Sequence, residues 1–136
     1  MSRENVEIVR RVYDAVARHD AAAVLAQYDP AVVHDNSRLP EARLVGERIT
    51  HGHEGIRRLF REWYEAWEYV EDNCEELIDA GERVISVVTR RGRGRASGAE
   101  TTARRGGVWT LRDGKVVRVV WFPSPEEALE AVGLRE

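Results

Sequence analysis

The sequence is poor in cysteine, lysine and long apolar runs. Cys74 is the single cysteine, so no internal disulfide can form, and a reducing compartment suits the chain. No apolar run approaches the roughly 20 residues that span a bilayer. The first residues, MSRENVEIVRR, lack the apolar segment of a signal peptide. Lys115 is the one lysine among 21 lysines and arginines, which suggests a GC-rich bacterial gene. These absences predict a cytoplasmic protein that does not associate with membranes.

What remains is the composition of a folded domain. Of its 136 residues, 43% are apolar and 33% are charged, which separates the chain from disordered sequences. This length corresponds to about one domain, so we expect a single domain over residues 1–136. The formal net charge of −3 gives no overall attraction to nucleic acid or to an anionic membrane.

One basic segment, RRGRGR, runs from Arg90 to Arg95. Arginines separated by glycines could contact phosphates or an acidic partner. The alternative is a strand that leads into a hairpin, with solvated arginines and with glycines in the turn. No aromatic residue alternates with the arginines, as a single-strand binder would need. We therefore expect Arg91, Arg93 and Arg95 in solvent and no nucleic-acid partner.

Apolar spacing predicts three helices before most of the strands. The first covers Asn5 to His19 with Asn5 as N-cap, and the segment AAAVLAQY forms a second, ended by Asp29-Pro30. The third runs from His53 to about Tyr69. Its apolar stripe consists of Ile56, Leu59, Phe60, Trp63 and Trp67.

Strand signals surround and follow the third helix. The segments AVVHD, CEELIDAG and RVISVVTRR each predict a strand, and GGVWTLRDGKVVRVVWF predicts a hairpin about Asp113-Gly114. Ser124 and Pro125 then open a short C-terminal helix, as N-cap and first residue. This order indicates an α+β fold with a mostly antiparallel sheet.

The last strand carries apolar side chains on both faces. Alternation places Val117, Val119 and Trp121 on one face, and Val116, Val120 and Phe122 on the other. A single helix layer covers only one face of a sheet. The other face is therefore predicted to form a homodimer, or else the sheet curves strongly enough to cover itself.

Polar residues gather where AVVHD ends, at His34, Asp35, Ser37 and Arg38. Neighbours on a strand point to opposite faces, so His34 and Asp35 cannot both enter an apolar interior. Two roles stay open for Asp35: a general base or acid in a cavity, or a structural ion pair with Arg38. In the first case Asp35 faces inward and His34 faces away.

A second polar group, HGHEG, spans residues 51–55. His-x-His-Glu is superficially metal-like, but a polar, glycine-containing start of a helix explains it as well. A zinc site needs more ligands than this segment offers, so we expect neither a metal nor another cofactor.

Five segments resemble SnoaL-like proteins of the nuclear transport factor two-like superfamily. In chain order they are NVEIVRRVYDAVARHD, YDPAVVHD, GHEGIRRLFREWYEAW, ELIDAGERVISVV and VWTLRDGKVVRVVWF. The resemblance covers nearly the whole chain. It implies a curved sheet wrapped around three N-terminal helices, in the shape of a cone with an apolar cavity. In such a fold, core and cavity wall coincide, so Tyr13, Trp63, Trp67, Trp109 and Trp121 become candidate ligand contacts.

The resemblance is weaker for chemistry. Ketosteroid isomerases of this superfamily carry a base at the position of Asp35, but their oxyanion-hole Tyr and Asp fall at about Val12 and near Gly106 or Gly107 here. The His and Asp of SnoaL-type cyclases fall on strands that carry Trp109 and Trp121. Of the Asp-Arg-Asp set of limonene-type epoxide hydrolases, this sequence matches one Asp.

The sequence therefore predicts that a small apolar ligand binds in the cavity. The ligand would be polyketide- or steroid-like, and Asp35, supported by Ser37 and Arg38, would act as base for proton transfer. A ligand-binding or dimerisation module without catalysis is the alternative.

Overall fold

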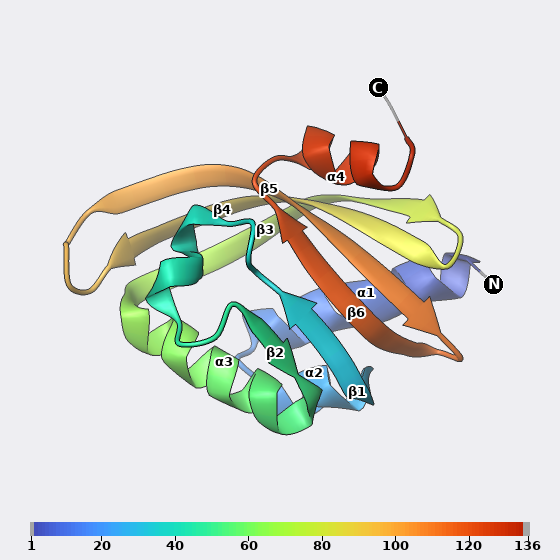
Figure 1. The fold of residues 1–136 in the computed structure, drawn as a ribbon, viewed down its shortest axis with the longest axis horizontal. Helices are drawn as coiled ribbons and strands as arrows, with labels where there is room; N and C mark the ends of the chain where they lie inside the picture. The colour runs from blue at the N-terminus through green and yellow to red at the C-terminus, as the bar shows by residue number, and fades with distance from the viewer. Residues whose placement is uncertain (1, 135–136) are drawn as a thin grey trace.

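Four α-helices, one 3-10 helix and a six-stranded sheet make up the computed structural model, which describes residues 2–134 (Figure 1). In chain order the elements are α1 (Ser2–Ala17), α2 (Ala21–Ala26), β1 (Tyr28–Asp35), η1 (Pro40–Leu44), β2 (Ile49–His51), α3 (Gly52–Ala66), β3 (Trp67–Ala80), β4 (Arg83–Gly94), β5 (Glu100–Arg112), β6 (Lys115–Phe122) and α4 (Pro125–Ala131). The strand order is β2-β1-β6-β5-β4-β3, antiparallel except for the parallel pair β1–β6. The predicted α+β fold with a mostly antiparallel sheet is confirmed. No helix within residues 2–134 is long and apolar enough to cross a membrane.

The predicted helices are present, with corrected ends. Asn5 lies inside α1 and its side-chain amide donates to the Gly81 carbonyl oxygen at 3.0 Å, so it is not the N-cap. Pro30 does not end α2, which stops at Ala26; it lies in β1, where the pairing with β6 is irregular and needs no N–H from proline. α3 ends at Ala66 because Trp67 already has extended backbone and begins β3.

A bulge in β6 changes the predicted faces of that strand. Thr110 pairs with Arg118 while Leu111 pairs with Val116, which leaves Val117 as an extra residue. Val116 therefore joins Val119 and Trp121 in the main core. The predicted grouping of Val117 with Val119 and Trp121 is wrong, because strict alternation fails at a bulge.

The opposite face of the sheet is partly covered by α4, seen above β4 and β5 in Figure 1. Ser124 caps this helix as predicted, with its hydroxyl accepting from the Glu127 backbone N–H at 3.2 Å. Ala128 packs directly over Gly106, where an added Cβ would lie 2.7 Å from the Ala128 Cβ. The chain thus supplies its own cover for part of the face that we assigned to a dimer.

The β4–β5 hairpin is also confirmed, but its arginines do not share one environment. Arg91 is exposed, as predicted. Arg95 is exposed as well, and it donates to the backbone carbonyl of Glu65 in the last turn of α3 and to that of Trp67, which follows the helix. Arg90, the first residue of the basic run, is buried with 6% exposure. Its expected place among solvated arginines is wrong, because two carboxylates meet it inside the fold.

Candidate functional site

A cavity of about 80 Å³ lies between the sheet and the helices α1 and α3. Its helical lining is Val12, Tyr13 and Val16 from α1, and Leu59, Phe60, Trp63 and Tyr64 from α3. The rest comes from the sheet and from the end of β1: Tyr28, His34, Asn36, Asp72, Arg90, Trp109 and Trp121. A further hollow of about 270 Å³ adjoins it and shares five lining residues with it, which are Tyr13, Val16, Trp63, Tyr64 and Asp72. The cavity therefore continues toward the surface between α1, α3 and β3.

His34, not Asp35, faces the cavity. Val32 and His34 alternate onto the inner face of β1, and Val32 is fully buried in the main core. Asp35 takes the opposite face and is not part of the cavity lining. The prediction that the two side chains point to opposite faces is confirmed. The expectation that Asp35 faces inward and His34 faces away is wrong, because the hydrophobic side of β1 includes His34.

The His34 imidazole is uncharged at neutral pH. Burial lowers its pKa to about 4, the nearby Arg90 charge lowers it as well, and the Asn36 side chain and Asp35 oppose the shift. Its Nδ1 atom is buried and has no hydrogen-bond partner. A buried polar atom without a partner is uncommon in folded proteins, and here it belongs to a residue of the cavity wall.

Asp35 instead holds the turn that follows β1. Its Oδ1 accepts from the Ser37 backbone N–H at 2.9 Å and from the Ser37 hydroxyl at 2.6 Å. Its Oδ2 lies 3.4 Å from Arg38 Nη1 and 3.9 Å from Arg118 Nη2. Burial raises the pKa of Asp35, but these hydrogen bonds and charges outweigh it and lower the pKa overall. The structural alternative for Asp35 matches this arrangement, with Ser37 and Arg38 as its supports.

Ser86 accepts hydrogen bonds from two residues of the cavity wall. The Tyr13 hydroxyl and the Trp109 indole N–H each donate to Ser86 Oγ at 2.9 Å. Gly107 lies beside this group, and an added Cβ there would be 2.6 Å from Ser86 Oγ. The positions at which the resemblance placed oxyanion donors are thus an apolar Val12 and a glycine without room for a side chain.

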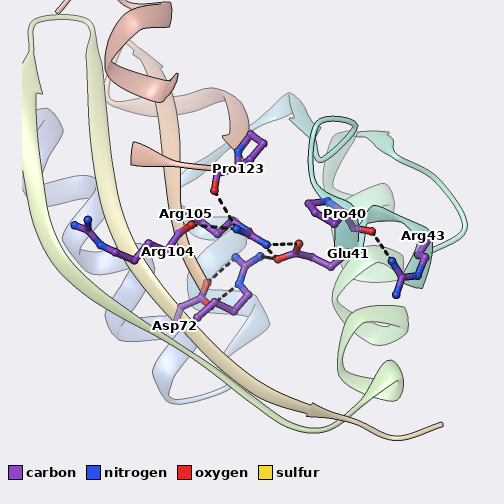
Figure 2. Close-up of polar contacts among 8 residues, drawn as sticks. Pro40, Glu41, Arg43, Asp72, Arg104, Arg105 and Pro123 are labelled. Carbon is purple, nitrogen blue, oxygen red and sulfur yellow. Dashed lines mark hydrogen bonds and ion pairs between the residues drawn. The ribbon is translucent and has the colours of Figure 1, made fainter. Parts of the chain in front are cut away.

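Two residues of the cavity lining, Asp72 and Arg90, belong to an ion-pair network that spans four elements and is drawn in Figure 2. Arg90 on β4 donates to both carboxylate oxygens of Asp72 on β3, at 2.7 and 2.9 Å. Arg90 Nη1 also donates to Glu41 of η1 at 3.1 Å. Arg105 on β5 binds the same Glu41 carboxylate through Nε and Nη2, at 3.1 and 2.9 Å. We call these four residues the Arg90 network.

Two aromatic rings lie close to the Arg90 guanidinium. Its central carbon lies 5.0 Å from the ring centroids of both Trp63 and Trp121, which also line the cavity. Although burial lowers the pKa of Arg90, Asp72 and Glu41 raise it overall, so the side chain stays charged. The cavity thus combines aromatic walls, one neutral imidazole and a charged but paired group.

The structure brings together four of the five predicted ligand contacts: Tyr13, Trp63, Trp109 and Trp121. Trp67 is the exception, because its ring packs over Gly92 instead of lining the cavity. Sequence reasoning missed Asp72 and Arg90. Opposite charges at cross-strand positions were the available signal, but reading it requires the β3–β4 register, which pairs Asp72 with Arg90.

The histidines of HGHEG lie at the start of α3, away from the cavity lining. His53 Nε2 lies 2.9 Å from the Tyr28 carbonyl oxygen, and His51 is exposed. Within residues 2–134 no three His, Cys, Asp or Glu side chains cluster so as to hold a metal ion.

Comparison with known families agrees with this architecture. The family model of the SnoaL-like domain matches residues 9–119. The chain belongs to the SnoaL-like domain family. No curated protein matches this SnoaL-like chain by sequence.

Solved structures share the fold of this SnoaL-like protein. An NTF2-like protein from Burkholderia thailandensis is 29% identical, with a TM-score of 0.78 over 91% of this chain and 95% of the other. TerC, co-crystallised with polyporic acid, is 22% identical, with a TM-score of 0.79 over 95% and 98%. A protein of ketosteroid isomerase-like fold from Catenulispora acidiphila, in complex with trimethylamine, is 16% identical, with a TM-score of 0.72 over 94% and 93%. The last two likenesses are of fold alone.

Proposed function

We propose that this SnoaL-like protein binds a small organic molecule in the cavity, with His34 as its principal polar contact. The observation that carries the proposal is the buried, unpartnered Nδ1 of His34, a residue of a cavity wall built mainly from aromatic and aliphatic side chains. A ligand hydroxyl, carbonyl or amine that hydrogen-bonds to this atom removes an unsatisfied group, and its apolar part gains burial against tryptophan and tyrosine rings. Binding of small molecules by relatives of the same fold supports this function.

The size of the cavity limits what enters. A volume of about 80 Å³ is smaller than the roughly 150 Å³ of an engineered cavity that holds benzene. A ring-bearing molecule therefore also needs the adjoining hollow of about 270 Å³. A polyketide- or steroid-like ligand would place one ring at His34 and extend through that hollow past Tyr64.

Proton transfer next to a carbonyl is the second candidate function, with His34 in place of Asp35 as the base. The neutral imidazole can accept a proton at Nδ1 in the tautomer that leaves this atom unprotonated. Two features favour binding over turnover. A pKa of about 4 makes His34 a weak base at neutral pH, and the donors of Tyr13 and Trp109 are already directed at Ser86.

Nuclear magnetic resonance of the tryptophan indole groups tests binding. We expect benzyl alcohol to shift the indole N–H signals of Trp63, Trp109 and Trp121, because these rings line the cavity. His34→Gln should weaken the affinity about five- to twentyfold, as expected for loss of one buried hydrogen bond. His51→Gln is the matched control because His51 is exposed outside the cavity. Equal affinities for all three proteins would contradict the proposal.

The same samples test turnover. Proton abstraction would exchange the hydrogens beside the carbonyl of cyclohexanone for deuterium in heavy water. We expect exchange at the buffer rate for a binding protein. Exchange that is faster with wild type and lost in His34→Gln would establish the second candidate function instead.

A further inference from the structure

We infer that the cavity selects uncharged ligands over anionic ones, and that Glu41, a residue outside the cavity lining, sets this selectivity. The inference rests on the proposed function, since it names the class of molecule that the same cavity accepts. It also assigns a role to η1, which lies beside the sheet as the short helical turn between β1 and β2 (Figure 1).

Two guanidinium groups converge on the single carboxylate of Glu41. Arg90 donates one hydrogen bond to it from β4, and Arg105 donates two from β5. Figure 2 labels Glu41 and Arg105 of this group. Side-chain exposures of 7%, 14% and 11% for Arg90, Arg105 and Glu41 place all three charges largely out of water. An arrangement of two buried arginines is the usual receptor for a carboxylate or phosphate, and here the chain fills it itself.

The charges of the Arg90 network cancel at the cavity wall. Asp72 and Glu41 supply two negative charges, and Arg90 and Arg105 supply two positive charges. Of the other polar residues in the cavity lining, the buried His34 imidazole is uncharged at neutral pH, and Asn36 has an uncharged amide. An anionic ligand would lose its hydration on entering the cavity and would find no unpaired positive charge there to compensate. An uncharged ligand loses much less hydration free energy.

Removing the Glu41 charge should reverse this balance. Without it, Arg90 keeps Asp72 but loses its second carboxylate, and Arg105 loses its acidic partner in the network. Because Arg90 itself lines the cavity, an excess positive charge then faces the ligand. The wall changes from one that rejects anions to one that attracts them, without any change in the residues that line it.

Benzyl alcohol and benzoate are the probes, since they have similar shapes and differ in charge at pH 7. Their dissociation constants would be measured from the tryptophan indole signals. For wild type we expect benzyl alcohol to bind about tenfold or more tighter than benzoate. Glu41→Gln should reduce the ratio of the benzoate dissociation constant to the benzyl alcohol dissociation constant about tenfold or more. The control Glu47→Gln, in the same connection between β1 and β2, removes a surface partner of Arg58 and should keep the wild-type ratio.

A double variant separates charge from contact. Glu41→Gln with Arg105→Gln has the same number of positive and negative charges in the network again, and it should return the ratio to within about threefold of wild type. If Glu41→Gln does not fold, as judged by far-ultraviolet circular dichroism, the single variant Arg105→Gln tests the inference instead. It leaves an excess negative charge and should raise the preference for benzyl alcohol.

The outcomes distinguish this inference from the proposed function. If wild type binds benzyl alcohol and a folded Glu41→Gln or Arg105→Gln keeps the wild-type ratio, the selectivity does not come from the network and the inference is wrong. Cavity binding then still stands. If benzyl alcohol shifts none of the three indole signals in wild type, the proposed function fails and the inference fails with it.

Discussion

Arg90 lies directly opposite Asp72 across the β3–β4 pair, and the two side chains form a two-bonded ion pair at 2.7 and 2.9 Å. One pair of side chains thus links the outermost strand of the sheet to its neighbour and forms part of the cavity lining. Since Arg90 also contacts Glu41, Trp63 and Trp121, this part of the lining depends on a single guanidinium.

Arg90→Met should strongly destabilise the fold. The change leaves the Asp72 carboxylate without its bidentate partner and removes the Arg90 contact of Glu41, so we expect a loss of about 3–5 kcal/mol in the free energy of unfolding. Urea denaturation measures it. Arg91→Met is the matched control: this neighbouring arginine is exposed, and its replacement should change stability by about 0.5 kcal/mol or less. Similar losses in the two variants would show that the Arg90 network contributes little.

The stability of the protein should fall between pH 6.5 and about 4 because of His34. The unfolded histidine binds a proton near its ordinary pKa of 6.5, whereas the buried imidazole does so only near its lowered pKa of about 4. Within this window the unfolded state holds more protons, so stability is lost as the pH falls, by up to about 3 kcal/mol.

His34→Gln cannot take up this proton and should have a flatter profile of unfolding free energy against pH. The exposed His51 again provides the control, because His51→Gln should follow the wild-type curve. Parallel curves for wild type and His34→Gln would mean that the imidazole is not held neutral by burial.

Asp35→Asn should reduce stability and leave ligand affinity within about twofold. Its carboxylate accepts two hydrogen bonds from Ser37 and faces away from the cavity, so we expect a loss of about 1–2 kcal/mol. Because the folded pKa of Asp35 is below its ordinary 3.8, this stabilisation is present above about pH 4 and is lost as the pH falls further. Urea denaturation and the benzyl alcohol titration measure the two effects. Loss of cyclohexanone exchange in Asp35→Asn, with His34→Gln unaffected, would restore Asp35 as the base.

Homodimerisation through the sheet face that α4 leaves open stays a prediction. The half-buried Val117 lies on this face beside Thr110 and Arg118, so a dimer formed there would bury it. We expect sedimentation equilibrium at tens of micromolar, the range of a weak interface, to give a dimer for wild type. Val117→Asp should give a monomer with unchanged circular dichroism. A monomeric wild type at that concentration would contradict the prediction.

The sequence by itself determined most elements and many of the faces. The period of the apolar residues in α1 and α3, the Asp113-Gly114 turn and the Ser124 cap act within a few residues of the chain, so they could be predicted locally. The family resemblance, carried by five such segments, extended this to the fold. Alternation also separated His34 from Asp35, because neighbouring side chains on any strand point apart.

Only the tertiary structure decided which of the two faces the cavity and which charges are buried. Alternation shows that the two side chains point in opposite directions, but it does not show which of them points inward. That choice follows from how β1 packs through Val32 against the core. Arg90 looked like one of several solvated arginines because its partners are distant in sequence: Asp72 is 18 residues away and Glu41 is 49 residues away. Burial of a charge is tolerated where such partners meet it, and short-range sequence patterns carry no information about that meeting.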